Sequence, residues 1–262
     1  MTRRHMTFPC EGNRLAGTLD SAPGTTGLLI VGGGNEIRSG AFSGQARIAA
    51  EIADAGYPVF RFDRRGIGDS EGANRGFRES GPDMAAALDA FRSLAPQLEK
   101  VVGFGNCDAA SALMLAGGAG CDALVLSNPW TIENDGESEA DDTPPPSAIR
   151  SRYLAKLRNP REIARLLSGG VDYRKLLRGI ARAVGPKAQP TSLAAEMQTA
   201  LASFAGPVRI LLAERDRTAQ VFAESWDRLD NRIARCPGAG HAYVEPEARA
   251  WLRERLLEAL RG

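Results

Sequence analysis

Cys107 stands at a predicted turn where a displayed thiol could act as a nucleophile. The mostly apolar run 101–104 predicts a buried strand, and the small residues from Asp108 onward predict a helix. Gly105 and Ala109 leave room for a tight turn between the two. The resulting Gly-x-Cys-x-Ala pattern is a variant of the Gly-x-Ser-x-Gly turn, which displays a nucleophile between a strand and a helix. The N-terminus of that helix would favour a thiolate, because its dipole and free N–H groups stabilise negative charge.

Two residues further along the chain could activate this thiol. His241 lies in the glycine-flanked segment "GAGHA", after a predicted strand, where its imidazole could serve as a general base. Asp216 follows another predicted strand and could accept the imidazole N–H, which would fix the tautomer. Glu214, two residues earlier, is the competing acid. The other histidine of the chain, His5, has no apparent partner in the sequence around it.

The glycine-rich segment "VGGGNE" follows the first buried strand after the N-terminal hairpin and could supply an oxyanion hole. We expect one backbone N–H donor from Asp108, the residue after the nucleophile, and the other from Gly34 or Asn35. The Asp108 carboxylate would raise the pKa of the neighbouring thiol unless a cation neutralises it, and Arg38 is the candidate cation. The segment lacks the Gly-Lys-Ser/Thr ending of a P-loop, which argues against nucleotide binding.

Composition excludes several other kinds of site. The four cysteines are widely spaced, with no Cys-x-x-Cys pair, so we expect neither a disulfide framework nor a metal site, and no cofactor. We interpret Cys10, Cys121 and Cys236 as packing residues. A net charge of +1 gives no footprint for nucleic acid. Without an apolar signal region or a stretch long enough for a transmembrane segment, a cytoplasmic location is predicted.

Alternating strands and helices must position these residues. A hairpin is predicted over residues 5–20, and the rest of the core alternates between strand and helix, which predicts an α/β fold with a mainly parallel eight-stranded sheet and helices on both faces. The later strands are predicted within 27–34, 57–63, 100–105, 121–130, 206–216 and 231–240, and the helices within 42–56, 82–98, 108–117, 219–229 and 245–260.

The alternation is interrupted over residues 131–205, which is too long for a plain loop. We predict a helical lid here, inserted after the sixth strand, with residues 1–130 and 206–262 forming the core. Between Ser147 and Pro190, eleven Arg or Lys residues accompany only two acidic ones, with leucine and isoleucine at helical spacing. The basic faces are either solvated or attract an anionic partner, such as an acyl carrier protein, coenzyme A or an acidic glycan.

Taken together, these segments resemble the α/β-hydrolase superfamily, in which nucleophile, acid and histidine follow in this order. The segment "DRRGIGDS", residues 63–70, is similar to its Asp-x-Arg-Gly-x-Gly-x-Ser motif, whereas Val31-Gly32 replaces its usual His-Gly. More narrowly, "GYPVFRFDRRGIGDSEG", "GNCDAASA", "LSNPW" and "AERDRTAQ" resemble the exosortase A system-associated hydrolases of exopolysaccharide-making bacteria. That resemblance implies a cysteine at the nucleophile position and no established substrate.

The expected function is a hydrolase in which Cys107, His241 and Asp216 cleave an ester or thioester through an acyl-enzyme. The substrate would be a small-molecule or carrier-bound acyl compound, and an anionic one would suit the basic lid. Two alternatives stay open. One is an acyltransferase in bacterial exopolysaccharide-related metabolism, and the other is a non-catalytic binding protein on a hydrolase fold.

Overall fold

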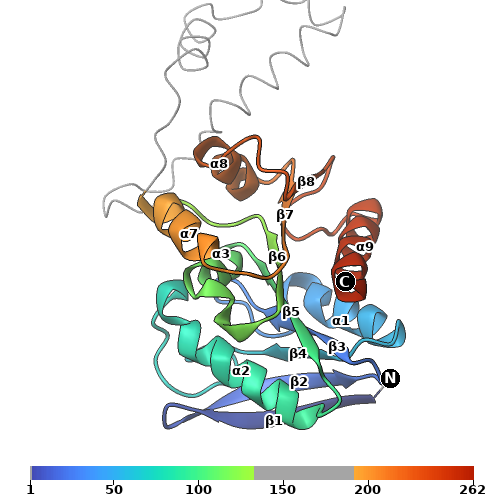
Figure 1. Cartoon of the computed structure of the whole chain (residues 1–262). Coiled ribbons are helices and arrows are strands. Elements are labelled where there is room, and N and C mark those ends of the chain that lie inside the picture. Colours follow the sequence, from blue (N-terminus) through green and yellow to red (C-terminus); the bar gives the residue numbers. More distant parts are fainter. Residues whose placement is uncertain (1, 133–191) are drawn as a thin grey trace, which may run out of the picture.

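An eight-stranded sheet forms the centre of the chain in its computed structural model, which describes residues 2–132 and 192–262 (Figure 1). The spatial order is β1-β2-β4-β3-β5-β6-β7-β8. The pairs β1–β2 and β2–β4 are antiparallel, and all other neighbours are parallel, so the predicted mainly parallel sheet of eight strands is confirmed. The strands are β1 (Thr2–Cys10), β2 (Asn13–Ser21), β3 (Thr26–Val31), β4 (Val59–Phe62), β5 (Lys100–Asn106), β6 (Ala123–Ser127), β7 (Val208–Ala213) and β8 (Ile233–Cys236).

Helices cover both faces of this sheet, as Figure 1 shows. One face packs against α1 (Gly44–Asp54) and α9 (Pro246–Arg261). The other packs against α2 (Gly81–Leu94), α3 (Asp108–Leu115), α7 (Ser192–Ala202) and α8 (Arg217–Ser225). Short 3-10 helices span Ala41–Ser43, Phe77–Glu79 and Gly117–Gly120.

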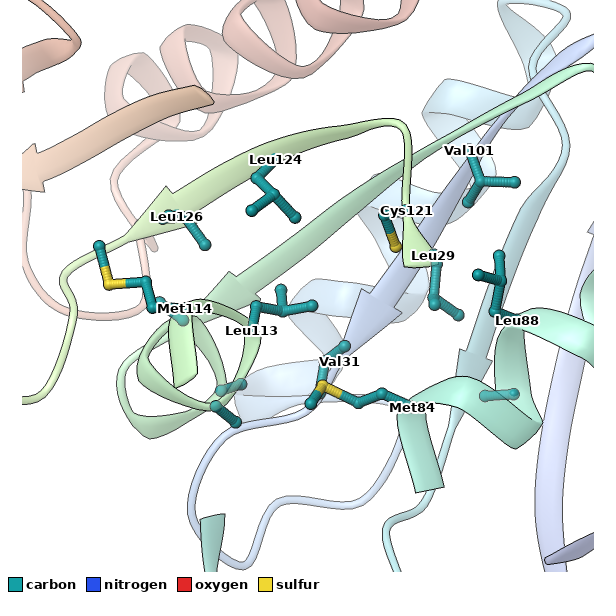
Figure 2. Close-up of a cluster of buried hydrophobic side chains, with 14 of the residues drawn as sticks. Leu29, Val31, Met84, Leu88, Val101, Leu113, Met114, Cys121, Leu124 and Leu126 are labelled. Atoms are coloured by element: carbon teal, nitrogen blue, oxygen red, sulfur yellow. The ribbon is translucent and has the colours of Figure 1, made fainter. Parts of the chain in front are cut away.

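Alternation along the buried strands distributes side chains between the two helical layers. In β3, Leu28 and Ile30 belong to the cluster under α1 and α9, whereas Leu29 and Val31 belong to the cluster under α2 and α3. Figure 2 shows the second cluster, in which side chains from the strands meet those of α2 and α3. Full burial of each such aliphatic side chain stabilises the fold by about 1.5–3 kcal/mol. Strands buried on both faces must be continuously apolar, which is why short runs of this kind predict them.

The predicted lid, residues 131–205, falls mostly outside the described residues, so its boundaries, its helices and its basic faces stay predictions. From its C-terminal part the structure describes α7. Leu193, Met197 and Leu201 follow one another at helical spacing and are buried in the same cluster as α3. This helix therefore lies in the layer that covers the sheet.

Membrane-spanning character is not found in the two described ranges, since none of their helices is both long and apolar enough to cross a bilayer.

Candidate active site

Cys107 occupies a sharp turn between β5 and α3. Its backbone has φ 62° and ψ −130°, a left-handed conformation that costs a residue with a Cβ about 1–3 kcal/mol. The turn brings the first residues of α3 close against β5. A Cβ at Gly105 would lie only 2.7 Å from the carbonyl carbon of Ala109, so the close packing requires glycine there. The Cys107 N–H donates to the carbonyl of Ser127 on β6 at 3.0 Å. The predicted turn is thus present, and it is strained at the residue that it displays.

The other three cysteines differ from Cys107 in their exposure. Cys10, Cys121 and Cys236 are buried, whereas Cys107 is partly exposed. Cys121 packs among the leucines of Figure 2, and burial raises the pKa of its thiol to about 12. Burial also raises the pKa values of Cys10 and Cys236. These three thiols are held in the neutral form and act as packing residues, as predicted.

His241 and Asp216 meet beside this turn. The Nδ1 atom of His241 lies 3.0 Å from Oδ2 of the buried Asp216. Hydrogen bonds to Asp216 and, second, to Cys107 raise the pKa of His241 to about 10, because both partners favour the imidazolium. Glu214, the competing acid, is exposed, and His5 lies on β1, where its Nδ1 contacts Oγ1 of Thr18 at 2.9 Å. The structure therefore brings Cys107, His241 and Asp216 together from three separate segments.

Asp216 is also the N-cap residue of α8. Its carboxylate oxygens accept hydrogen bonds from the backbone N–H groups of Thr218 and Ala219, both at 3.2 Å. Asp is among the preferred N-cap residues because it satisfies N–H groups that have no partner within the helix. The helix thus holds the carboxylate in place, and Oδ2, which accepts from Ala219, also faces the imidazole.

Two asparagines that the sequence analysis missed hold the backbone of His241. Asn106 Nδ2 donates to the His241 carbonyl at 3.2 Å, and Asn128 Nδ2 lies 3.4 Å from the same oxygen. Asn128 also donates to Asn106 Oδ1 at 2.9 Å and accepts from the Ala213 N–H at 2.8 Å. Both side chains sit at the ends of strands that lead into the site, and that position was the available signal. They join β5, β6 and β7 to the loop that carries the imidazole.

The glycine-rich loop after β3 approaches Cys107 most closely at Gly33. A Cβ there would lie 2.6 Å from the Asn106 carbonyl and 3.5 Å from Cys107 Cβ, so the loop can take up this position only with glycine. The N–H of Gly34, a predicted oxyanion donor, donates to Asp108 Oδ1 at 2.6 Å. The side chain of Asn35, the other candidate, accepts from Asn74 Nδ2 at 3.1 Å. Asp108 is the first residue of α3, where a backbone N–H has no partner within the helix.

The cation beside Asp108 is Arg64, and the prediction of Arg38 was wrong. Arg64 Nη2 lies 3.2 Å from Asp108 Oδ2, and the Arg64 side chain is almost fully buried. Arg38 instead pairs with Asp63 and, at 2.9 Å, with Asp69. Its guanidinium is held by these two carboxylates of the loop after β4, so it does not neutralise Asp108.

A cavity of about 70 Å³ adjoins the site. Asn106 and Ala242, the chain neighbours of Cys107 and His241, line it together with apolar side chains that include Ile48, Phe104 and Leu252. Within residues 2–132 and 192–262, no group of three or more His, Cys, Asp or Glu side chains is arranged to hold a metal ion. The groups that Cys107, His241 and Asp216 bring to the site are a thiol, an imidazole and a carboxylate.

Solved structures share this fold over nearly the whole chain. The esterase Pf2001 of Pyrococcus furiosus superposes with a TM-score of 0.62 at 14% identity, covering 99% of this chain and 90% of that one. The alpha/beta hydrolase GrgF of a Penicillium species gives 0.61 at 18% identity, with 100% of both chains covered. A thioesterase domain from the curacin biosynthetic pathway gives 0.57 at 12% identity, covering 98% of this chain and 100% of that one. At such identities the likeness shows the fold alone.

Sequence comparison gives the family. No curated protein sequence matches the chain. The profile of the Alpha/beta hydrolase family matches residues 28–255, a span that includes Cys107, Asp216 and His241. With this match and an eight-stranded sheet of the same architecture as esterases and a thioesterase, the chain belongs to the alpha/beta hydrolase family.

Proposed function

We propose that this protein is a cysteine-dependent acyl hydrolase that cleaves an ester or thioester through an acyl-enzyme on Cys107. The observation that carries the proposal is the pairing of His241 Nδ1 with Asp216 at 3.0 Å beside the strained turn of Cys107, whose thiol contributes to the raised pKa of His241. A raised imidazole pKa next to a thiol favours the thiolate–imidazolium pair, which is the nucleophilic form of cysteine. Asp216 would hold the imidazole in the tautomer whose Nε2 faces the sulfur.

Acylation would begin with attack of the Cys107 thiolate on the carbonyl carbon of the substrate. The carbonyl π electrons move to oxygen, and the oxyanion is stabilised by the N–H of Asp108 and an N–H of the loop 33–35. When the tetrahedral intermediate collapses, the bond to the leaving group breaks and the His241 imidazolium donates its proton to the departing thiol or alcohol. The product of this half-reaction is a thioester on Cys107.

Deacylation would use the same groups in reverse. His241, now neutral, takes a proton from water, and the hydroxide equivalent attacks the thioester carbonyl. Collapse of the second intermediate releases the carboxylic acid and restores the thiolate–imidazolium pair. The mostly apolar cavity beside Asn106 and Ala242 offers space for an apolar part of the substrate. An esterase and a thioesterase domain on the same fold support an acyl substrate.

The test is covalent labelling followed by intact-mass measurement. The folded chain is mixed with p-nitrophenyl esters and N-acetylcysteamine thioesters of short acyl chains. We expect a mass increase of one acyl group, located on Cys107 by peptide mapping, together with release of the leaving group. Cys107→Ala should form no adduct, and His241→Gln should form it far more slowly. A folded wild-type chain that gives neither adduct nor product would refute the proposal and favour the non-catalytic alternative.

Hydrolysis and acyl transfer share the acyl-enzyme and differ in what removes the acyl group. Adding alcohol, amine or sugar acceptors to the preformed acyl-enzyme separates them, because transfer yields the acylated acceptor and hydrolysis yields the free acid. We expect the free acid to dominate, since His241 is partly exposed to water.

A further inference from the structure

The backbone N–H and the backbone carbonyl of Gly34 each form a hydrogen bond with a charged side chain, and the two side chains pair with each other. Its N–H donates to Asp108 Oδ1 at 2.6 Å, and the carbonyl oxygen of Gly34 accepts from Nη2 of Arg64. The same Nη2 lies 3.2 Å from Asp108 Oδ2, which closes a ring of three contacts. We call this arrangement, made by Gly34, Arg64 and Asp108, the Gly34 clamp.

Both side chains of the clamp are themselves fixed. The side chain of Arg64 is 6% exposed and that of Asp108 16%, so their pairing is shielded from solvent. Arg64 Nη1 donates to Oγ of the buried Ser80 at 3.2 Å, and Ser80 in turn donates to the Gly76 carbonyl at 3.0 Å. Asp108 begins α3, whose dipole favours a carboxylate in the first turn. The clamp thus ties the loop after β3 to two rigid parts of the fold.

Besides the clamp, the peptide between Gly33 and Gly34 has one backbone hydrogen bond within the loop, in which the Gly33 carbonyl accepts from the Glu36 N–H at 3.0 Å. Gly34 is exposed and has φ 54°, and a Cβ there would meet nothing within 4 Å. Gly33, by contrast, is wedged against the Asn106 carbonyl and Cys107. Rotation of the peptide that joins these two glycines would redirect the N–H of Gly34, and it would also break the hydrogen bond from the Glu36 N–H to the Gly33 carbonyl. Charge-assisted hydrogen bonds at both ends of Gly34 prevent that rotation.

We infer that Asp108 and Arg64 are positioning residues that hold the loop 33–35 in the conformation needed to stabilise an oxyanion on the carbonyl attacked by Cys107. The inference rests on the proposed function. It assigns the side chain of Asp108 a task separate from that of its backbone N–H. It also implies that the N–H of Gly34 is engaged by the clamp, which leaves the N–H groups of Gly33 and Asn35 as the loop's candidate donors to the oxyanion.

Two reactions of the same thiol distinguish positioning from a general effect on Cys107. Acylation by an ester develops an oxyanion, whereas alkylation by iodoacetamide displaces iodide at a saturated carbon and develops none. A disordered oxyanion loop should therefore slow acylation and leave alkylation largely unchanged. Dividing the acylation rate by the alkylation rate cancels changes in the thiolate fraction.

The experiment compares Asp108→Ala, Asp108→Asn and Arg64→Met with the wild-type chain. We expect the rate ratio to fall at least about tenfold in Asp108→Ala and Arg64→Met, because loss of a single oxyanion donor lowers rates by about 10²–10³. Asp108→Asn should recover much of the loss, since its amide oxygen can still accept from the Gly34 N–H. Arg209→Met is the matched control, because Arg209 pairs with Glu258 at the far end of β7.

Electrostatics alone predicts a different pattern. Removing the Asp108 charge would favour the Cys107 thiolate and raise both rates, and removing the Arg64 charge would disfavour it and lower both rates. The ratio of acylation to alkylation would then stay unchanged in both variants. Equal rate ratios in all variants, or a rate ratio that rises in Asp108→Ala or in Arg64→Met, would each overturn the inference. Should Arg64→Met fail to fold, the two Asp108 variants at their partly exposed position decide the matter. Absence of acylation in the wild-type chain would instead refute the proposed function.

Discussion

Asp216 carries two tasks that can be separated by a pair of substitutions. It caps α8 through the N–H groups of Thr218 and Ala219, and it faces Nδ1 of His241 at 3.0 Å. Asparagine is as good an N-cap residue as aspartate, whereas alanine cannot accept a hydrogen bond from the backbone. Asp216→Asn should therefore keep the cap and lose the charge that orients His241, and Asp216→Ala should lose both.

The expected magnitudes differ for the two tasks. Loss of the cap in Asp216→Ala should cost about 1 kcal/mol in the free energy of unfolding, with a range of about 0.5–2 kcal/mol. Both variants should lose the interaction of the Asp216 charge with the helix dipole, about 0.3–1 kcal/mol, and the ion pair with the His241 imidazolium, so the cap accounts for the difference in stability between them. For a chain of this size, 1 kcal/mol corresponds to about 2–4 °C in Tm. The acylation rate should fall in both variants by about 10²–10⁴-fold. In Asp216→Asn an amide facing Nδ1 favours the tautomer that cannot accept a proton from Cys107, and in Asp216→Ala no group at this position orients the imidazole.

Urea unfolding and the rate of Cys107 acylation are measured on the same preparations. Glu214→Gln is the matched control, since Glu214 is an exposed acid two residues away. An Asp216→Asn variant with unchanged acylation would show that the contact with His241 plays no part in the reaction. Equal stability losses in the two variants would show that the cap contributes nothing beyond the charge.

Two further predictions concern the imidazole and the glycine loop. Because the pKa of His241 is raised from 6.5 to about 10 in the folded chain, its contribution to stability should be complete below pH 6.5 and be lost as the pH rises to 10. Urea unfolding of wild type and His241→Gln across this range measures the contribution, and a pH-independent difference between them would contradict it. Gly33→Ala should slow acylation and cost about 1–3 kcal/mol, because its Cβ would meet the Asn106 carbonyl at 2.6 Å. Gly81→Ala, with no atom closer than 3.9 Å, is the control, and equal acylation in both would refute the close approach.

The sheet could be predicted from the sequence because its signals are local. Short apolar runs that end in glycine, such as "GLLIVGGG", indicate buried parallel strands, and the alternation with helices defines their arrangement. The turn at Cys107 could be predicted for the same reason. The meeting of Asp216 with His241 followed from their places after strands whose carboxyl ends share one edge of the sheet.

The contacts around Asp108 could not be predicted, because they depend on how loops cross in space. Arg38 and Arg64 are both basic residues near glycine-rich turns, and nothing local shows that Asp63 and Asp69 hold Arg38 while Arg64 reaches Asp108. The role of Asn128 likewise depends on hydrogen bonds to residues from other strands. Pairings between residues far apart in sequence leave no periodic trace in it.

The hydrogen bonds from Asn106 and Asn128 to the carbonyl of His241 bear on the order in which the site forms during synthesis. Asn106 and His241 are separated by 135 positions, so the turn that carries the Cys107 thiol is synthesised long before His241. Closing so long a stretch of chain is slow compared with forming the local strand–turn–helix unit around Cys107. During synthesis, which proceeds from the N-terminus, the thiol is therefore present without the imidazole that would ionise it. Under the proposed function, activation of Cys107 by His241 therefore becomes possible only after the last strand has been synthesised.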